Sequence, residues 1–283
     1  MRKCIFCSAE EKTDNKFTIE HIIPEAFRNK TVKIDSVCSN CNLKLGDNID
    51  CKIADSDLFR LARSVKKIKG KKGTVNYIKE GKDEDENSYI VKNLNEYKRK
   101  PKIETNQNEL KVIAPSIEEG KRIIETKLLK NGYSKEKINE ILKNVSIASN
   151  KTTEINIPVE FDFKYFYLEC LKITYEYLYA CFGEKLINSK TGTKIKAILI
   201  NAINGNLPDY EDIQMYFIED NNINNSLNLL IDSEINTDKR NNCIYAFSDN
   251  ERIYVCISLL GYNATVAICN ELKINNFEEI IFA

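Results

Sequence analysis

Residues 4–51 read CIFCSAEEKTDNKFTIEHIIPEAFRNKTVKIDSVCSNCNLKLGDNIDC, and this stretch decides how the chain is organised. It contains two Cys-x-x-Cys pairs, Cys4 with Cys7 and Cys38 with Cys41. Each pair brings two thiolates close together, and two pairs complete the tetrahedral site that Zn2+ prefers. The alternative, a redox dithiol, usually opens a helix in a βαβ unit, and no such unit surrounds Cys4. The sequence therefore predicts a structural zinc site on these four cysteines.

A second motif lies between the two cysteine pairs. Glu20 and His21, the only histidine of the chain, follow a short β-type run and precede Ile-Ile-Pro. Neighbouring side chains of a straight strand face opposite ways, so Glu20 and His21 share a side only where the strand bends or bulges. A carboxylate and a neutral oxygen can hold Mg2+, and a neutral imidazole can take a proton from water. Glu20, Asn42 and His21 supply these three chemistries.

The combined pattern resembles the HNH endonucleases of the ββα-metal type, in the subfamily that carries a structural zinc ion. The pattern runs Cys-x-x-Cys, Glu-His-Ile-Ile-Pro, Cys-x-x-Cys-Asn, Leu-Gly and Ile-Asp within about the first 60 residues. The resemblance implies that a hairpin carries the acidic residue and the histidine and that the following helix carries the last ligand. It implies that His21 is the general base and that Glu20 and Asn42 bind a catalytic Mg2+ or Mn2+ ion.

Two positions depart from the family pattern. The acidic position is more usually Asp, and Glu20 is one methylene longer. The middle position is often Asn, and the nearest candidate before the second cysteine pair is Asp35. Simpler roles also remain open, because Glu20 could orient His21 and Asn42 could cap a helix. Two further acids, Asp47 and Asp50, are expected to be solvated or to position the helix rather than to bind metal.

Charge is unevenly distributed along the chain of 283 residues, although its formal net charge is zero. Residues 1–80 carry 17 Lys and Arg against 11 Asp and Glu, a net of +6, whereas residues 200–283 carry 4 against 13, a net of −9. A basic N-terminal half is expected to attract a phosphate backbone and an acidic end to repel it.

The most basic segment directly follows the cysteine region. Seven basic residues and no acid lie between positions 60 and 72. A run of this kind is usually a solvated surface, but its place after a nuclease motif favours contact with DNA phosphates. The predicted DNA-binding residues are Arg60, Arg63, Lys66, Lys67 and Lys69.

The other six of the ten cysteines mostly lie in apolar surroundings and are expected to be buried thiols. No signal peptide precedes Cys4, and no apolar run is long enough to span a bilayer. The sequence therefore predicts a cytoplasmic protein without a membrane partner.

The expected fold class is α+β, with a zinc-stapled ββα-metal unit fused to a larger α+β domain. The expected domains are an HNH domain at 1–57, a basic connecting segment at 58–73 and an α+β domain at 74–283. Strands are expected at 17–22, 32–37, 74–78, 88–91, 109–113, 153–161, 215–219, 242–247, 252–260 and 265–269. Helices are expected at 40–54, twice within 116–144, at 194–202, and at 163–182, where aromatic residues indicate a buried central helix.

The expected function is metal-dependent hydrolysis of DNA phosphodiester bonds. By analogy, the resemblance also implies an effector in bacterial defence against foreign DNA. The alternative is a catalytically silent, zinc-stapled module that binds nucleic acid or protein. The acidic C-terminal third is better suited to a protein partner or to homo-oligomerisation than to DNA.

Overall fold

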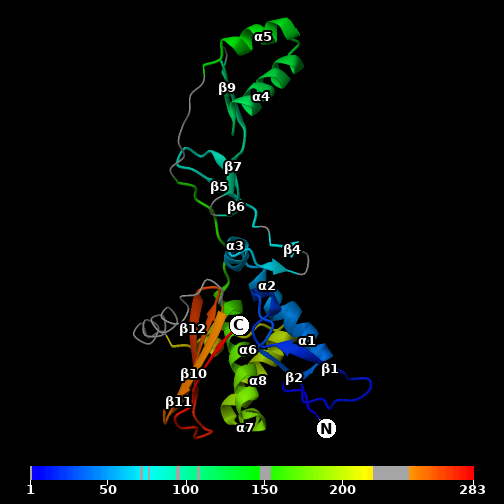
Figure 1. Cartoon of the computed structure of the whole chain (residues 1–283), viewed down its shortest axis with the longest axis vertical. Coiled ribbons are helices and arrows are strands. Elements are labelled where there is room, and N and C mark those ends of the chain that lie inside the picture. Colours follow the sequence, from blue (N-terminus) through cyan, green and yellow to red (C-terminus); the bar gives the residue numbers. More distant parts are fainter. Residues whose placement is uncertain are drawn as a thin grey trace. The chain divides into compact units, whose positions relative to one another are not determined.

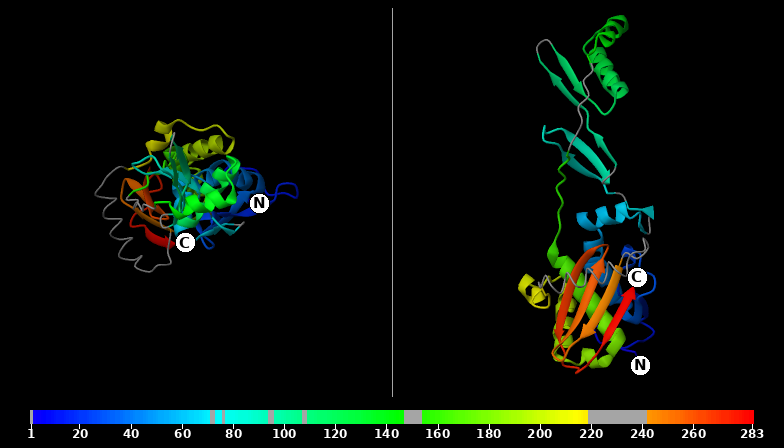
Figure 2. Two further views of the ribbon diagram at one scale, coloured as in Figure 1. Left: turned by 90° about the horizontal axis from the view of Figure 1, so that it is seen from above. Right: turned by 60° about the vertical axis from the view of Figure 1, so that its left-hand side comes forward.

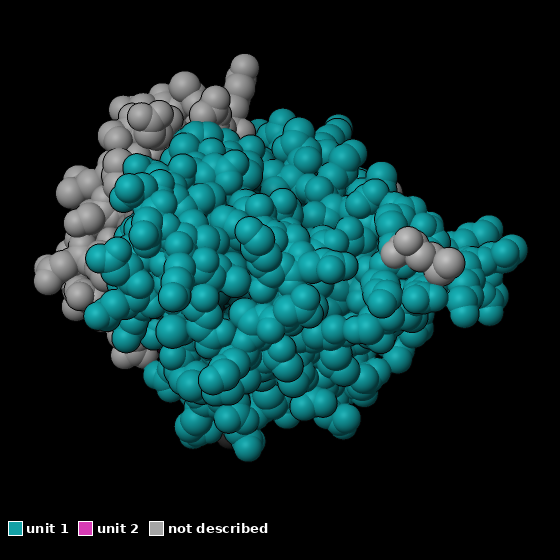
Figure 3. Space-filling view, turned by 90° about the horizontal axis from the view of Figure 1, so that it is seen from below, with its two compact units in different colours: residues 1–75, 160–283 teal, residues 76–159 magenta. Residues whose placement is uncertain are grey.

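The structure, a computed structural model, describes residues 2–70, 73–75, 77–93, 96–106, 109–146, 154–218 and 242–283. It forms two compact units: unit 1 combines residues 1–75 with 160–283, and unit 2 comprises residues 76–159. Helices and strands mix in both units, which confirms the α+β class (Figure 1). Figure 3 shows the continuous surface of unit 1 from one side.

Unit 1 begins with a hairpin followed by a helix. Strands β1 (Phe17–His21) and β2 (Lys33–Cys38) pair antiparallel, and a bulge interrupts their register between Thr18 and Glu20. The short helix η1 (Glu25–Phe27) lies in the loop between the strands. One helical run follows as α1 (Ser39–Leu45), the π-helical turn η2 (Gly46–Asp50) and α2 (Cys51–Ala54). The predicted strand, strand and helix are therefore confirmed.

A third helix and a small hairpin complete the N-terminal part. Helix α3 spans Asp57–Val65, and strands β3 (Lys69–Gly70) and β4 (Gly73–Thr74) pair after it. The predicted basic segment 58–73 thus begins as a helix and ends in a short hairpin, with residues 71 and 72 outside the described part.

The C-terminal part of unit 1 is a four-stranded antiparallel sheet with helices. The sheet has the order β12-β11-β10-β13, from strands β10 (Asn242–Ser248), β11 (Arg252–Leu259), β12 (Tyr262–Cys269) and β13 (Glu278–Phe282). The helices are α6 (Phe163–Phe182), α7 (Glu184–Ile187), α8 (Lys190–Ile203) and α9 (Tyr210–Gln214). Helix α6 runs between this sheet and the N-terminal elements (Figures 1 and 2). The predicted central, buried aromatic helix is confirmed.

One hydrophobic core joins the N-terminal elements to residues 160–283. The ring of Phe59 on α3 lies 5.1 Å from Phe27, 6.0 Å from Phe166 on α6 and 5.2 Å from Tyr262 on β12, measured between centroids. Because these rings share one interior, the N-terminal part does not form a separate core. The division at 75/76 lies close to the expected boundary at residue 73. The division at 159/160 has no counterpart in the sequence-based domains, which kept 74–283 together.

Unit 2 contains two small sheets and a helical pair. Strands β5 (Lys79–Lys82), β6 (Ser88–Asn93) and β7 (Glu96–Arg99) form one sheet, and β8 (Lys102–Thr105) pairs with β9 (Leu110–Ile113). Helices α4 (Ile117–Lys130) and α5 (Lys135–Lys143) enclose a small core of Ile124, Leu128 and Ile138. Both helices begin with a serine cap, Ser116 and Ser134.

Several predicted strands are wrong or displaced. The strand expected at 74–78 is wrong for its described residues after Thr74: β4 ends at Thr74 and β5 begins at Lys79. The described part of 153–161 contributes only an isolated bridge between Asn156 and Lys82. Within 215–218, Phe217 makes only a single bridge with Val266, and Glu219 lies outside the described residues. Strand β13 was not expected. Within the described residues, no helix is long and apolar enough to cross a membrane.

Candidate metal and catalytic site

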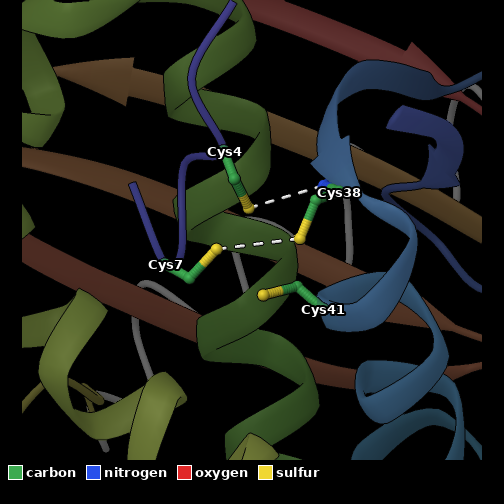
Figure 4. A group of neighbouring side chains, drawn as sticks. All are labelled: Cys4, Cys7, Cys38 and Cys41. Carbon is green, nitrogen blue, oxygen red and sulfur yellow. Dashed lines mark hydrogen bonds between the residues drawn. The ribbon is translucent and has the colours of Figure 1, made fainter. Parts of the chain in front are cut away.

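The four predicted zinc ligands converge at the N-terminal end of unit 1. Cys4 and Cys7 lie in the first loop, Cys38 ends β2 and Cys41 lies in the first turn of α1. Their sulfur atoms all lie within 4.8 Å of one another, and they point toward a common centre (Figure 4). The structure thus confirms that the two Cys-x-x-Cys pairs form one cluster.

The spacing of the sulfurs fits zinc. The Sγ atoms of Cys7 and Cys38 lie 3.7 Å apart. A tetrahedral ion with Zn–S bonds of about 2.3 Å would separate its sulfurs by about 3.8 Å. The backbone N–H of Cys38 donates to Cys4 Sγ at 3.4 Å, and hydrogen bonding from Cys41 lowers the pKa of Cys4 to about 4. The same contact with Cys4 raises the pKa of Cys41 well above its usual value, and burial raises the pKa of Cys38. Of these three cysteines, Cys4 alone is therefore stabilised as a thiolate, the form that binds a metal ion.

Tertiary contacts hold the cysteine loop against α6. The hydroxyl of Tyr175 donates to the carbonyl of Ile5 at 3.0 Å, and the rings of Phe6 and Tyr175 lie 5.6 Å apart. Phe6 and Ile5 are fully buried between the first two cysteines. The cysteine cluster is therefore connected directly to the helix that forms the centre of unit 1.

The two predicted catalytic residues at the end of β1 differ in their exposure to solvent. Glu20 is only 4% exposed, whereas His21 is partly exposed. The bulge between Thr18 and Glu20 changes the alternation of the strand just before this pair. Among the described residues, no hydrogen bond or ion pair joins the side chains of Glu20, His21 and Asn42.

Glu20 faces a buried lysine on α6. The Nζ atom of Lys172, which is fully buried, lies 2.8 Å from Glu20 Oε1 in an ion pair. The same Nζ donates to Asp50 Oδ1 at 2.8 Å. Two further carboxyl groups, Glu169 and Glu176, are fully buried with an oxygen 3.9 Å from this Nζ. We call these four acids and Lys172 the carboxylate cluster.

Burial and charge decide the ionisation of the carboxylate cluster. Burial raises the pKa of Glu169 and of Glu176 well above the usual range, against the opposing effect of Lys172. Burial also raises the pKa of Glu20, and the Lys172 ammonium opposes this rise. Burial alone would lower the pKa of Lys172, but the surrounding carboxylates, Asp50 first, raise it well above its usual value. The lysine is thus a fixed positive charge inside unit 1.

Asn42 on α1 contacts the backbone of β1. Its Nδ2 donates to the carbonyl of Ile19 at 3.0 Å, which places the amide next to the Glu20 position. No hydrogen bond of the described residues uses Asn42 Oδ1 or Glu20 Oε2. These two oxygens are hard donors of the kind that Mg2+ and Mn2+ prefer, so the residues fit the divalent ion that the sequence implied.

The loop between β1 and β2 is fixed by a residue that the sequence analysis missed. Asn29 is fully buried, and its Nδ2 donates to the carbonyls of Ile23 and Val32 at 2.7 and 2.8 Å. Its Oδ1 accepts from the backbone N–H of Thr31 and Val32 at 2.9 and 3.0 Å. These four bonds pin the loop that follows His21. A neutral, compact side chain with two donors and an acceptor was the only signal in the sequence.

Asp35, the sequence candidate for the middle position, has a different role. Its carboxylate is exposed and lies 2.7 Å from Arg2 Nη1 in a surface ion pair. Asp47 is exposed on the π-helical turn, as expected for a solvated acid. Asp50, in contrast, is a member of the carboxylate cluster, so of the two expected roles it does not have that of a solvated acid, and its bond to Lys172 on α6 is consistent with that of a group that positions a helix.

The predicted DNA-binding residues do not share one environment. Arg63 is 6% exposed, and its Nη1 donates to the carbonyl of Ala54 at 2.9 Å, so its guanidinium serves the fold. Arg63 is therefore removed from the candidate DNA surface. Lys66, Lys67 and Lys69 are exposed beyond the end of α3, and Arg60 is partly exposed on that helix.

The comparisons with known proteins agree with this geometry. Residues 4–58 match the family model described as HNH endonuclease. This segment is an HNH domain that contains the cysteine cluster, Glu20, His21 and Asn42, and the family indicates a nuclease. The comparison with curated proteins finds no match, and neither does the comparison with solved structures.

Proposed function

We propose that this chain is a metal-dependent endonuclease that hydrolyses phosphodiester bonds of DNA through its N-terminal HNH domain. The observation that carries the proposal is the bond from Asn42 on α1 to the carbonyl of Ile19 on β1, within the segment that matches the HNH family. It supports a site in which the helix amide, Glu20 and His21 lie at one end of the hairpin.

Each residue has a separate role in the proposed reaction. His21, partly exposed at the end of β1, accepts the proton of the attacking water when its imidazole is neutral. Glu20 Oε2 and Asn42 Oδ1 would hold Mg2+ or Mn2+, which when bound stabilises charge on the phosphate. Asn29 fixes the loop after His21, and the zinc site fixes α1 relative to β2.

The proposed DNA surface is limited to exposed basic residues after the HNH core. Lys66, Lys67 and Lys69 are exposed, and lysines of this kind add affinity through phosphates rather than through base readout. Replacing all three with Gln should weaken binding to unrelated duplexes to a similar extent and reduce its salt dependence. If the triple variant bound DNA as tightly as wild type, these three lysines would not belong to the DNA-binding surface.

Plasmid nicking tests the proposed activity. Zinc-loaded protein is incubated with supercoiled plasmid and Mg2+ or Mn2+, beside His21→Ala and the control Thr18→Ala on the exposed part of the same strand. Wild type and the control should nick the plasmid, and His21→Ala should lose at least about a hundredfold of the rate, as for loss of a general base. Folded wild type that cleaves neither plasmid, single-stranded DNA nor RNA would end the endonuclease proposal.

One observation favours the alternative of a catalytically silent binding module. Glu20 already holds an ion pair with Lys172 and is nearly inaccessible to solvent. In this reading the HNH domain is retained as a zinc-stapled scaffold for nucleic acid or protein. Binding of DNA with wild-type affinity by His21→Ala, without cleavage by either protein, would support it.

An effector role in defence against foreign DNA is proposed only from the family resemblance. Comparison of phage plating on cells with wild type or His21→Ala tests that role. The C-terminal part of unit 1 is proposed to contact a protein partner or a second copy, and light scattering of the full chain measures the latter.

A further inference from the structure

Neither the HNH match nor the sequence motifs account for Lys172, a buried lysine in unit 1. It lies in the middle of α6, outside residues 4–58, and is fully buried. Its helix is otherwise dominated by aromatic and aliphatic residues. An isolated ammonium in such an interior is strongly unfavourable unless carboxylates compensate it. The two carboxylates closest to the lysine are those of Glu20 and Asp50, each 2.8 Å from its Nζ.

The two partners belong to the two elements that carry the proposed metal ligands. Glu20 is itself a proposed ligand on β1. Asp50 ends the π-helical turn η2, which continues directly from α1, where the other proposed ligand Asn42 lies. A single ammonium at 2.8 Å from both carboxylates thus links the hairpin to the helical run. This link acts together with the bond from Asn42 to Ile19 to set the separation of the two ligand-bearing elements.

We propose that Lys172 is a positioning residue of the nuclease site, whose ammonium fixes Glu20 Oε1 and leaves Oε2 for the divalent ion. This inference rests on the proposed function. Residues that orient metal ligands typically change metal affinity by about 10- to 100-fold when they are lost. The assignment extends the site to a helix that lies beyond the family match, so residues 4–58 alone are an incomplete site.

The length of the Glu20 side chain explains why its carboxylate needs the contact with Lys172. Glutamate has one more rotatable bond than the aspartate more usual at this position, so its carboxylate needs a further contact to be held in one orientation. Lys172 supplies that contact from the core side, while Asp50 holds the ammonium in place. Glu169 and Glu176, on the same helix, each have a carboxyl oxygen 3.9 Å from the ammonium.

Binding of Mn2+ to the zinc-loaded full chain, measured by electron paramagnetic resonance, tests the proposal. Lys172→Met and Asp50→Asn should each weaken Mn2+ binding by about tenfold or more. The matched control Lys164→Met, the same change near the start of α6, should bind Mn2+ as wild type does. Asp50→Asn keeps the Lys172 ammonium and nearly the same side-chain volume. It therefore tests the contact between Asp50 and Lys172 even if Lys172→Met does not fold.

A background without the Glu20 carboxylate separates positioning from general support of the fold. In Glu20→Gln protein, adding Lys172→Met or Asp50→Asn should cause no further loss of Mn2+ affinity, because the two residues act through Glu20. An equal loss in both backgrounds, unchanged affinity in the single variants, or tighter Mn2+ binding by Lys172→Met would each overturn the proposal. Wild type that binds no Mn2+ and nicks no DNA would instead refute the proposed function itself.

Discussion

Unit 1 contains two clusters of side chains that can carry negative charge, and the charge of each cluster is compensated in a different way. The four cysteines present sulfurs within 4.8 Å of one another, which a Zn2+ ion would neutralise. The carboxylate cluster carries its own cation, because Lys172 Nζ lies 2.8 Å from both Glu20 and Asp50. The first cluster therefore depends on an ion from outside the chain, whereas the second depends on a distant part of the chain itself.

The difference matters for how the HNH domain is stabilised. Cys4 and Cys7 lie in the first loop, Cys38 ends β2 and Cys41 lies in the first turn of α1, so zinc would mainly fix the loop, the hairpin and α1. Lys172 connects that same hairpin and helical run to α6, at the centre of the shared core. The two clusters thus connect different parts of the domain, and removing each should have a distinct effect.

Loss of zinc should have the largest effect on stability. Cys41→Ser removes one of four ligands, and metal binding to such a site contributes on the order of 10 kcal/mol to folding in small zinc domains. We expect the thermal midpoint of unit 1 to fall by more than about 10 °C. Thermal unfolding by circular dichroism, with zinc content measured in parallel, gives the result. The exposed Cys269→Ser is the control and should unfold as wild type does.

The same result should follow from chelation without any substitution. Wild type treated with a strong zinc chelator should unfold at the temperature of untreated Cys41→Ser, because both lack the same ion. A zinc-free protein that unfolds with wild type would show that the shared core alone holds the cysteine loop in place.

Breaking the internal ion pairs should have the next largest effect. Lys172→Met leaves Glu20 and Asp50 without their cation, and removal of one partner from a buried charge pair costs about 3–5 kcal/mol. Urea unfolding measures the loss, with Lys164→Met as the control. Adding Glu20→Gln and Asp50→Asn to Lys172→Met should restore part of the stability, since the unpaired charges are then removed. If Lys172→Met were as stable as Lys164→Met, the cluster would contribute nothing to folding.

The two clusters also differ in how well the sequence predicted them. The cysteines could be identified because both pairs have local spacing, and one metal geometry explains all four. Lys172 could not, because its partner Glu20 lies far away in sequence and the contact arises only when α6 packs against the hairpin. The signal in α6 was three charged residues, Glu169, Lys172 and Glu176, at helical spacing within an otherwise apolar and aromatic run.

The secondary-structure predictions also succeeded where the signal was local in the sequence and failed where it was not. The hairpin, the helical run after it and α6 were predicted from periodicity and turn residues, and the structure confirms them. The strand expected at 215–219 was wrong for its described residues: α9 ends at Gln214, and within 215–218 only Phe217 makes a β-bridge, with Val266. The domain division was drawn from the extent of the HNH-like motif and from the basic run after it, and neither carries information about the core that joins α3 to α6 and β12.

Asn29 should rank third, since it stabilises a loop rather than the core. Asn29→Ala removes four hydrogen bonds and takes away the partners of the Ile23 carbonyl and the Val32 N–H, while the Val32 carbonyl keeps its bond from the Ile22 N–H. We expect a loss of about 2–3 kcal/mol, typical of unsatisfied buried groups. Asn15→Ala is the control, because its amide makes one exposed bond to the carbonyl of Glu10. Equal midpoints for the two variants in urea unfolding would contradict the assigned role of Asn29.

The smallest effect should come from Asp35, which the sequence placed near the site and the structure places on the surface. Its ion pair with Arg2 has side-chain exposures of 69% and 46%, and such exposed pairs contribute about 1 kcal/mol or less. Asp35→Asn should therefore unfold within that margin of wild type and should nick plasmid at the wild-type rate. Glu20→Gln, the matched removal of one carboxylate charge from the buried pair, should abolish nicking. If Asp35→Asn and Glu20→Gln nicked plasmid at the same rate, the Glu20 carboxylate would not be needed for cleavage. The ion pair between Glu20 and Lys172 would then contribute to stability but not to activity.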